Sequence, residues 1–236
     1  ILNAYGYVLT NHSNDFKKAE KLIKKAIKSK SKKFYYLSTA HVYNSPLIGH
    51  FDESSSVQNQ HPYATSHFYG EKALIKELQN KNIKGAVLRL SNCFGRPATN
   101  AKECWNLVLN QFIRDAVYEG KIHITGNALS KRDFLPIMEL NTVIKKIIDF
   151  PSITPYIINI STGRTLSLED ISLLVQKIIF QELGKSIEIS SNYKEEEGLL
   201  SISNTSLDSM GIEVNNDLNE EIRFFIRFLK NTISNN

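Results

Sequence analysis

The feature that most constrains the fold is the alternation of strand-like and helix-like stretches in the first half of the chain. An apolar stretch at 34–37 is followed by a helical pattern at 63–80, and a second apolar stretch, 86–90, comes after it. An earlier pair has the same order, with strand-like residues at 1–5 and a helical pattern at 15–29. Strands that alternate with helices are joined by crossover connections, which build a parallel sheet with helices on both faces. The sequence therefore predicts a doubly wound α/β fold.

The second half of the chain is more mixed. Its expected elements are, in chain order, a helix at 105–119, a strand at 121–124 that stops at Gly126-Asn127, a helix at 141–150, a strand at 156–160, a helix opened by Ser167 and a helix at 219–230. Ser167 is expected to be the N-cap of its helix, because its hydroxyl can accept from the free first-turn amides and acids follow it in that turn.

Composition places the chain among ordinary globular proteins. Its 236 residues are 42% hydrophobic and 22% charged, which excludes a coiled coil, a collagen and a disordered chain. The two cysteines exclude a disulfide-rich fold, and neither they nor the six histidines show a metal-binding spacing. No apolar run reaches the roughly 18 residues of a membrane helix, and the given sequence does not open with a short basic segment followed by an apolar stretch, so we expect no secretory signal. We therefore expect a cytoplasmic protein without a membrane partner.

The net charge of +5 is local. Nine lysines and one acid lie between Lys17 and Lys33, and the apolar residues among them recur at helical spacing. We interpret this run as the solvated face of an amphipathic helix. Nucleic-acid binding would need interleaved aromatic residues or a known motif, so we expect no nucleic-acid partner.

Polar side chains that could carry out chemistry stand at a strand end and on the helix that follows. Thr39 ends the strand at 34–37, while Tyr63 and His67 are four apart and share a helix face. A tyrosine can move a proton onto or off a substrate oxygen that a hydroxyl also holds, and a cation beside the tyrosine lowers its pKa from about 10 towards neutral. Ligands of such sheets bind at the carboxyl ends of the strands. Taken singly, however, such a pair is more often part of a core or a surface.

The order of several segments makes a stronger case. The segments are Ser38-Thr39 with Val42-Tyr43, His61 to Lys72, Leu88 to Pro97, Gly126 to Pro136, Asn159 to Gly163 with Ser167, and Met210-Gly211. In order and spacing they resemble the extended short-chain dehydrogenase/reductase family, in its nucleotide-sugar epimerase/dehydratase branch. The resemblance implies a Rossmann-like sheet in residues 1–92 and a mainly substrate-binding region in 93–236, of which 134–160 return to the sheet.

The resemblance also implies a function, an NAD- or NADP-dependent epimerase, dehydratase or ketoreductase that acts on a nucleotide-linked sugar. The implied catalytic residues are Thr39, Tyr63 and His67. The implied cofactor-binding residues are Ala4, Tyr5, Gly6, Ser38, Tyr63, His67 and Ser91. The implied substrate-binding residues are Thr39, His41, Asn92 and Arg132. Two of them have plain alternatives, since Arg132 could form a surface salt bridge and Asn92 could cap a loop.

His67 departs from the family pattern, which usually has lysine at this position. That lysine binds the ribose and lowers the pKa of the tyrosine. A histidine with a pKa of about 6.5 is only about a quarter charged at pH 7. His67 is therefore either a working variant or a sign of weakened catalysis. The second possibility keeps a non-catalytic alternative open, a sugar-nucleotide-binding or assembly protein on the same fold.

The glycine-rich loop of the family, Gly-x-x-Gly-x-x-Gly, is a second departure. The chain has eleven glycines, and no two of them are three apart. By the order of the family, this loop would precede Ile1, so we expect the chain to be a fragment that lacks roughly 60–90 residues of the pattern. The choice between NAD and NADP stays open for the same reason. The family often dimerises through the tyrosine-bearing helix, which implies a homodimer with Phe68 and Leu74 at its interface.

Overall fold

The computed structural model describes residues 33–80, 84–97, 102–150 and 156–234. The strand expected at 1–5 and the helix expected at 15–29 lie outside the described residues, and so do the candidate residues Ala4, Tyr5 and Gly6. The chain divides into two compact units. Unit 1 contains the described residues up to Ser91, Ile144–Ser161 and Ile202–Glu213; unit 2 contains Asn92–Val143, Thr162–Ser201 and the described residues from Val214 on.

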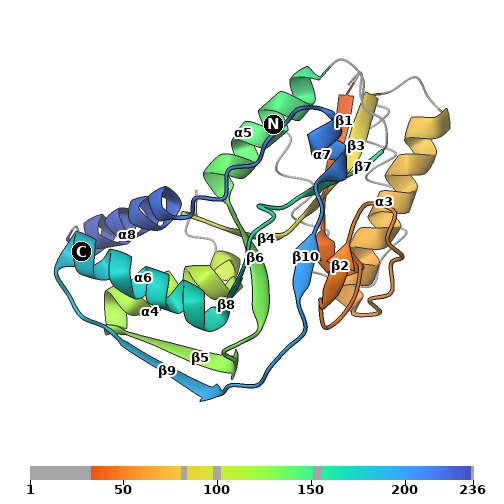
Figure 1. The fold of residues 1–236 in the computed structure, drawn as a ribbon. Helices are drawn as coiled ribbons and strands as arrows, with labels where there is room; N and C mark the ends of the chain where they lie inside the picture. The colour runs from red at the N-terminus through yellow and green to blue at the C-terminus, as the bar shows by residue number, and fades with distance from the viewer. Residues whose placement is uncertain (1–32, 81–83, 98–101, 151–155, 235–236) are drawn as a thin grey trace. The chain divides into compact units, whose positions relative to one another are not determined.

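Unit 1 is built on a parallel sheet of β1 (Lys33–Thr39), β3 (Lys84–Leu90) and β7 (Ile157–Ile160), in the order β1-β3-β7 (Figure 1). Every pair of neighbours is parallel, with Thr39 opposite Leu90 in the first pair and Leu90 opposite Ile160 in the second. The structure therefore confirms the predicted α/β class with a parallel sheet.

Helix α3 (Pro62–Asn80) contacts β1 and β3 along one side of the sheet. Its buried residues Leu74 and Leu78 pack against Tyr36 of β1 and Val87 of β3. Leu74 is fully buried in this cluster, so the expectation that it would contact a second protomer is wrong. Helical periodicity could not separate a core leucine from an interface leucine, because both lie on apolar stripes.

Shorter elements complete unit 1. They are η1 (Ala40–Val42), β2 (Gly49–Phe51), the end of β10 (Leu200–Ile202) and α7 (Thr205–Ser209), and the second half of α5 (Ile137–Asp149) also belongs to this unit. Segments far apart in the sequence are joined here, since the main-chain amide of Ser203 donates to the carbonyl of Phe51 over 2.8 Å.

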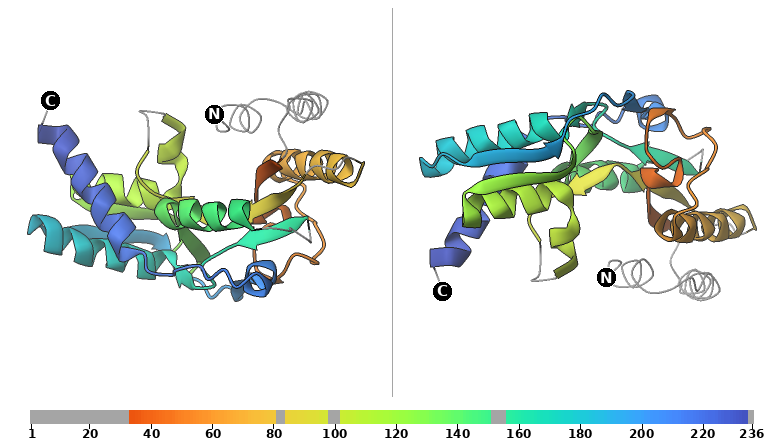
Figure 2. Two further views of the ribbon diagram at one scale, coloured as in Figure 1. Left: turned by 90° about the horizontal axis from the view of Figure 1, so that it is seen from above. Right: turned by 90° about the horizontal axis from the view of Figure 1, so that it is seen from below.

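Unit 2 contains three long helices, α4 (Val108–Glu119), α6 (Leu168–Leu183) and α8 (Asn219–Ser234), which contact one another (Figure 2). Between them lies the largest buried cluster of the described residues, which includes Ile113, Ile171 and Phe225. The strands of unit 2 are the parallel pair β5 (Lys121–Asn127) and β9 (Glu188–Tyr193), together with β4 (Asn92–Phe94), β6 (Lys131–Pro136) and β8 (Thr165–Ser167), and a short helix η2 spans Lys102–Asn106.

Helix α6 begins where the sequence predicts. Ser167 is its N-cap and accepts a hydrogen bond from the amide of Asp170 over 2.9 Å, while Asp170 accepts from the amide of Ser167. The helix ends at Gly184, whose φ of 65° is the left-handed conformation that glycine adopts readily. Within the described residues, no helix combines the length and the apolar character needed to cross a membrane.

Candidate active site

The carboxyl ends of β1 and β3 bring three candidate residues to one edge of the sheet in unit 1. Ser38 and Thr39 end β1, and Ser91 directly follows β3. The parallel register places Thr39 opposite Leu90, and the amide of Ser91 donates to the carbonyl of Ile160 over 3.0 Å. The three residues therefore occupy the edge where parallel α/β sheets bind ligands.

Thr39 is buried and is the N-cap of η1. Its Oγ1 accepts a hydrogen bond from the amide of His41 over 3.2 Å. The carbonyl of His41 in turn accepts from Nδ2 of Asn59 over 2.6 Å, which fixes the turn on its other side. A threonine hydroxyl that accepts from the main chain still has its own proton to donate.

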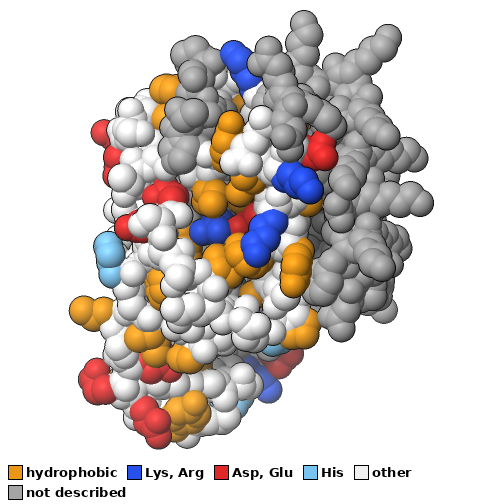
Figure 3. Space-filling view, turned by 90° about the vertical axis from the view of Figure 1, so that its right-hand side faces the viewer, with side chains coloured by type: hydrophobic (Ala, Val, Ile, Leu, Met, Phe, Trp, Pro, Cys, Tyr) orange, Lys and Arg blue, Asp and Glu red, His pale blue; other side chains and the backbone are white. Residues whose placement is uncertain are grey.

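Tyr63 lies in the first turn of α3, and its ring meets that of His67 edge to face, with centroids 4.7 Å apart. The structure thus places the two residues on one helix face, as their spacing predicts. Tyr63 is 41% exposed, but Tyr69 on the same helix is 45% exposed. Figure 3, which colours tyrosine with the hydrophobic residues, shows hydrophobic side chains between charged ones on one face of the molecule. Exposure alone therefore does not distinguish Tyr63; its contact with His67 does.

His67 is buried, with 5% of its surface exposed. Among the described residues, neither of its ring nitrogens has a hydrogen-bond partner. Burial lowers the pKa of His67 from its ordinary 6.5 to about 4. The ring is therefore neutral at pH 7, with one donor and one acceptor. The expectation that about a quarter of it would be charged is wrong, because sequence position cannot reveal the loss of hydration that disfavours the imidazolium.

Tyr36 of β1 closes the other side of this histidine, with ring centroids 6.1 Å apart. Burial raises the pKa of Tyr36, and the charges of Glu71 and Tyr63 raise it further, so it remains a neutral phenol. Its hydroxyl lies so near to α3 that a Cβ at Gly70 would be 2.4 Å away. The glycine thus permits a close approach of α3 to β1 beside His67.

A buried ion pair that the sequence did not suggest lies behind these residues. Glu71 of α3 accepts from Arg89 of β3 through both oxygens, over 3.0 Å from Nε and 2.6 Å from Nη2. Ser38 donates to the same carboxylate over 2.5 Å. The guanidinium of Arg89 lies 4.8 Å from the ring centre of Tyr43, whose hydroxyl donates to Asn159 of β7 over 2.6 Å. We refer to Ser38, Tyr43, Glu71, Arg89 and Asn159 as the Glu71–Arg89 network.

Asn92 and Arg132 belong to unit 2. Nη1 of Arg132 donates to Oγ of Ser130 over 2.7 Å and to the carbonyl of Lys131 over 2.6 Å. Burial lowers the pKa of Arg132, and the charge of Glu197 partly offsets this. In the described part of the chain, this guanidinium donates to Ser130 and Lys131 and not to a carboxylate. This arrangement differs from the surface salt bridge that was the plain alternative for Arg132.

Asn92 opens β4 and ties it to β6. Its Nδ2 donates to the carbonyl of Asp133 over 3.1 Å. Asp133 is fully buried, and its two oxygens accept from the amide and the hydroxyl of Thr162, each over 3.0 Å. Asn92 therefore joins β4 to β6 through its side chain, a contact different from the loop cap that was its plain alternative.

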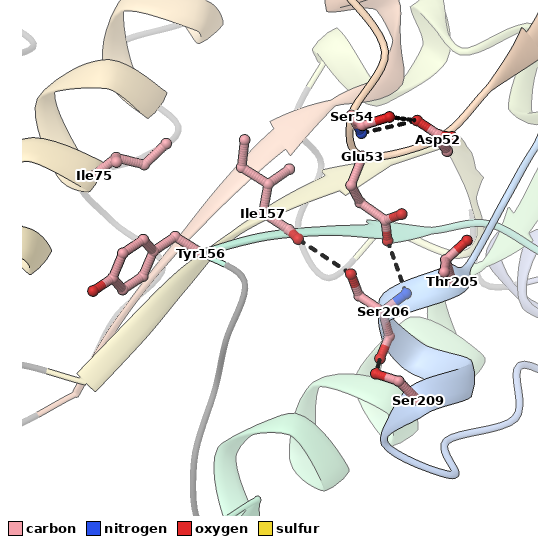
Figure 4. A pocket seen from close by; sticks show the side chains of 9 residues that line it. All are labelled: Asp52, Glu53, Ser54, Ile75, Tyr156, Ile157, Thr205, Ser206 and Ser209. Atoms are coloured by element: carbon pink, nitrogen blue, oxygen red, sulfur yellow. Dashed lines mark hydrogen bonds between the residues drawn. The ribbon is translucent and has the colours of Figure 1, made fainter.

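A pocket of about 580 Å³ opens elsewhere in unit 1 (Figure 4). The residues that line it are Asp52, Glu53, Ser54, Ile75, Tyr156, Ile157, Thr205, Ser206 and Ser209. Oε1 of Glu53 already accepts from the amides of Asn159 and Ser206, over 3.1 and 3.2 Å. The lining contains none of the candidate residues.

Comparisons with curated proteins give partial matches. The chain is 32% identical to dTDP-D-glucose 4,6-dehydratase of Mus musculus over 114 residues, which are 48% of this chain and 31% of that protein. The enzyme of Homo sapiens matches over the same length with the same identity. The matched stretch thus spans less than a third of the length of these relatives.

Comparisons with solved structures extend over more of the chain. UDP-glucose 4-epimerase from Thermotoga maritima has a TM-score of 0.73 at 19% identity, covering 99% of this chain and 76% of that one. UDP-glucuronic acid 4-epimerase from Bacillus cereus, solved with UDP-glucuronic acid and NAD, has a TM-score of 0.73 at 18% identity, covering 95% and 72%. At such identities these likenesses show that the Rossmann-like fold is shared.

The membership of the chain rests on a match to a family model. Residues 9–161, more than half of the chain, match the model of the NAD dependent epimerase/dehydratase family. This stretch contains the ends of β1 and β3, the pair Tyr63 and His67, and the Glu71–Arg89 network. The chain belongs to the NAD-dependent epimerase/dehydratase family.

Proposed function

We propose that this chain carries the catalytic residues of an NAD- or NADP-dependent epimerase, dehydratase or ketoreductase that acts on a nucleotide-linked sugar. The observation that carries the proposal is the contact of Tyr63 with the buried ring of His67, whose nitrogens have no hydrogen-bond partner among the described residues. Family membership supports it. So do three solved relatives, two of them determined with a UDP-sugar and NAD and one with NADPH.

The three reactions share one step, the oxidation of a sugar hydroxyl or its reverse. In this step the phenolate form of Tyr63 accepts the proton of the sugar hydroxyl as general base, and in the reverse direction the Tyr63 hydroxyl returns it as general acid. Thr39 donates a hydrogen bond to the same oxygen, because its hydroxyl keeps its own proton while its oxygen accepts from the amide of His41.

The described residues fit a nicotinamide dinucleotide, which supplies reversible hydride transfer when bound. A buried polar group without a partner is costly, and the neutral ring of His67 offers one donor and one acceptor, as two ribose hydroxyls require. Ser91 lies at the edge of the sheet where Ser38 and Thr39 end β1. Ser38 was expected to contact the cofactor as well, but its proton is donated to Glu71, so it can act there only as an acceptor.

We propose that Arg132 binds the diphosphate of the sugar nucleotide and that His41 and Asn92 contact its sugar. Support comes from the guanidinium of Arg132, which the side chain of Ser130 and the main chain hold through a single nitrogen. The planar guanidinium suits phosphate oxygens because it can donate two parallel hydrogen bonds. We also propose a homodimer, for which Phe68 of α3 is half-buried and available while Leu74 is not.

Replacing Tyr63 by phenylalanine tests the catalytic assignment. Loss of a general acid or base lowers turnover by roughly 10²- to 10⁴-fold, so Tyr63→Phe should lose at least about 100-fold in kcat. Tyr69→Phe is the matched control, since Tyr69 lies on the same helix with similar exposure. The measurement is product formation by the full-length protein from UDP-glucose and dTDP-glucose with NAD or NADP. Equal turnover in Tyr63→Phe and the unsubstituted protein would exclude the assignment.

Two features favour the non-catalytic alternative: the lowered pKa of His67, at a position where the family usually has lysine, and the absence of the glycine-rich loop from the given sequence. Calorimetric titration of the full-length protein with NAD and with NADP separates the two functions. The proposed enzyme binds one of them, and His67→Ala weakens that binding. If the protein binds neither dinucleotide but does bind a sugar nucleotide, the non-catalytic function is correct.

A further inference from the structure

The burial of Glu71 and Arg89 calls for an explanation other than stability. Their side chains are 1% and 3% exposed, in the core of unit 1. Removing two charges from water is costly, and replacing such a pair by apolar residues is often neutral or stabilising. A planar ion pair with two parallel hydrogen bonds fixes the orientation of its two side chains relative to each other, and an apolar contact does not.

The pair joins three elements at one point. Glu71 belongs to α3, Arg89 to β3, and Ser38, which donates to Oε1 of Glu71, to β1. Because both oxygens of Glu71 are engaged, α3 can neither rotate nor slide along the sheet without breaking at least one of these hydrogen bonds. Ser38 is adjacent to Thr39, and Glu71 follows Tyr63 by about two helical turns.

Further contacts hold Arg89 from its other side. The ring of Tyr43 lies against the guanidinium, and the Tyr43 hydroxyl donates to Oδ1 of Asn159. Nδ2 of Asn159 donates to the carbonyl of Ser203 over 3.0 Å, and its amide donates to Glu53. The guanidinium of Arg89 is thus held by groups that are themselves hydrogen-bonded. Such support is expected where the position of a functional side chain must be exact.

We propose that Glu71 and Arg89 are positioning residues, which set the place of Tyr63 on α3 relative to Thr39 at the end of β1. This role rests on the proposed function of these two hydroxyls. Rates of reaction are steep in geometry, since a misplacement of about 1 Å can cost on the order of 100-fold. A small rotation of α3 therefore reduces proton transfer while the bound state of the substrate is little changed.

The test replaces Arg89 by lysine, which keeps the charge but cannot make the paired, planar contact. Arg227→Lys is the matched control, because Arg227 makes the same two-bond contact with Glu182 on the surface of unit 2. We expect Arg89→Lys to lower kcat on the order of 10- to 100-fold, with KM changed less than about twofold. Arg227→Lys should leave both at their original values. Tyr43→Phe removes the hydroxyl that bonds to Asn159 and also interacts with Arg89, but it retains the ion pair, so it should lower kcat by a smaller factor.

A second readout does not need turnover. The ring signals of His67 and their magnetisation transfer to Tyr63, measured by NMR, report the place of α3, because the two rings are in contact. Arg89→Lys should change these signals and Arg227→Lys should not. If the protein has no turnover but these signals change, the proposed function fails, and Glu71 and Arg89 set the place of α3 without a catalytic consequence.

One result overturns the positioning role. It is an Arg89→Lys protein that unfolds at lower urea concentration yet keeps its kcat, its KM and its His67 signals, because the pair would then serve stability alone. If Arg89→Lys does not fold, the same comparison is made with Tyr43→Phe, which retains the ion pair. Unchanged kcat and unchanged His67 signals in that folded variant count equally against the role.

Discussion

His67 shows how burial changes the chemistry of a single side chain. Its folded-state pKa of about 4 lies below its ordinary value of 6.5, so between these values the unfolded chain binds a proton that the folded chain does not. The neutral ring therefore makes its full contribution to the free energy of unfolding above pH 6.5, and this contribution is lost as the pH falls towards 4. At about 1.4 kcal/mol for each pKa unit, the full loss is about 3 kcal/mol.

Replacing His67 by glutamine should remove this acid sensitivity, since the amide does not titrate. We expect the free energy of unfolding of the original protein to fall by about 2–3 kcal/mol more than that of His67→Gln as the pH falls through this window. Urea unfolding at pH values above and below the window measures it. His123→Gln, at an exposed histidine, is the control and should behave like the original protein. Parallel pH curves for all three proteins would contradict the prediction.

The candidate residues were predictable from the sequence to the extent that they lie on regular local patterns. Tyr63 and His67 are one helical turn apart, and Thr39 ends an apolar stretch. The Glu71–Arg89 network was missed because its partners are 18 and 33 residues apart and meet only through the packing of α3 on the sheet. One signal was available, since Arg89 interrupts a buried apolar strand and such an arginine requires a buried acid.

At the scale of elements, the approach of α3 to β1 depends on the missing side chain of Gly70. Alanine normally stabilises a helix by about 0.5–1 kcal/mol relative to glycine. Here its Cβ would lie 2.4 Å from the hydroxyl and 2.6 Å from Cζ of the buried Tyr36. Overpacking of this kind costs about 1–3 kcal/mol, so the clash outweighs the gain in helix propensity.

We therefore expect Gly70→Ala to lower the free energy of unfolding by about 1–2 kcal/mol. Gly126→Ala in β5 is the control, because a Cβ there meets nothing within 4 Å. Its effect should stay within about 0.5 kcal/mol. Chemical denaturation of the two variants beside the original protein measures both. A Gly70→Ala protein as stable as the original would show that the helix moves away from β1 without cost.

The elements that the sequence predicted are those long enough to show periodicity. Strands β1 and β3 and helices α3 and α8 fall within a few residues of their expected bounds. Strands β2, β4 and β8 have three residues each, too few for a pattern, and β9 reads Glu-Ile-Ser-Ser-Asn-Tyr with a mostly polar composition. Strand β5 continues through Gly126-Asn127, where a stop was expected, because its pairing with β9 resumes at Asn127 after a bulge.

At the scale of the whole molecule, each unit is assembled from three separate stretches of chain. The chain passes from one unit to the other five times, after Ser91, Val143, Ser161, Ser201 and Glu213. One of these passages lies inside helix α5, so the helix is interrupted if either unit unfolds. Connectivity of this kind favours a single cooperative transition over two separate ones.

The only tryptophan, Trp105, provides a test, because it belongs to unit 2 and stacks on Phe225 with ring centroids 6.0 Å apart. Its fluorescence therefore reports the unfolding of that unit. We expect the fluorescence midpoint in urea to coincide with that of far-ultraviolet circular dichroism, and Gly70→Ala in unit 1 to lower both midpoints equally. A Trp105 midpoint that stays in place in Gly70→Ala would show that the units unfold independently.

Because the stretches of the two units alternate along the chain, recombination between related genes is restricted. A single breakpoint between two related genes cannot transfer unit 2 whole, because its three stretches are separated by residues 144–161 and 202–213 of unit 1. Exchange of the complete unit 2 would need several simultaneous crossovers. We therefore expect this architecture to vary by point substitutions and by insertions in loops, with the sheet that carries Thr39 and Arg89 inherited together with unit 2.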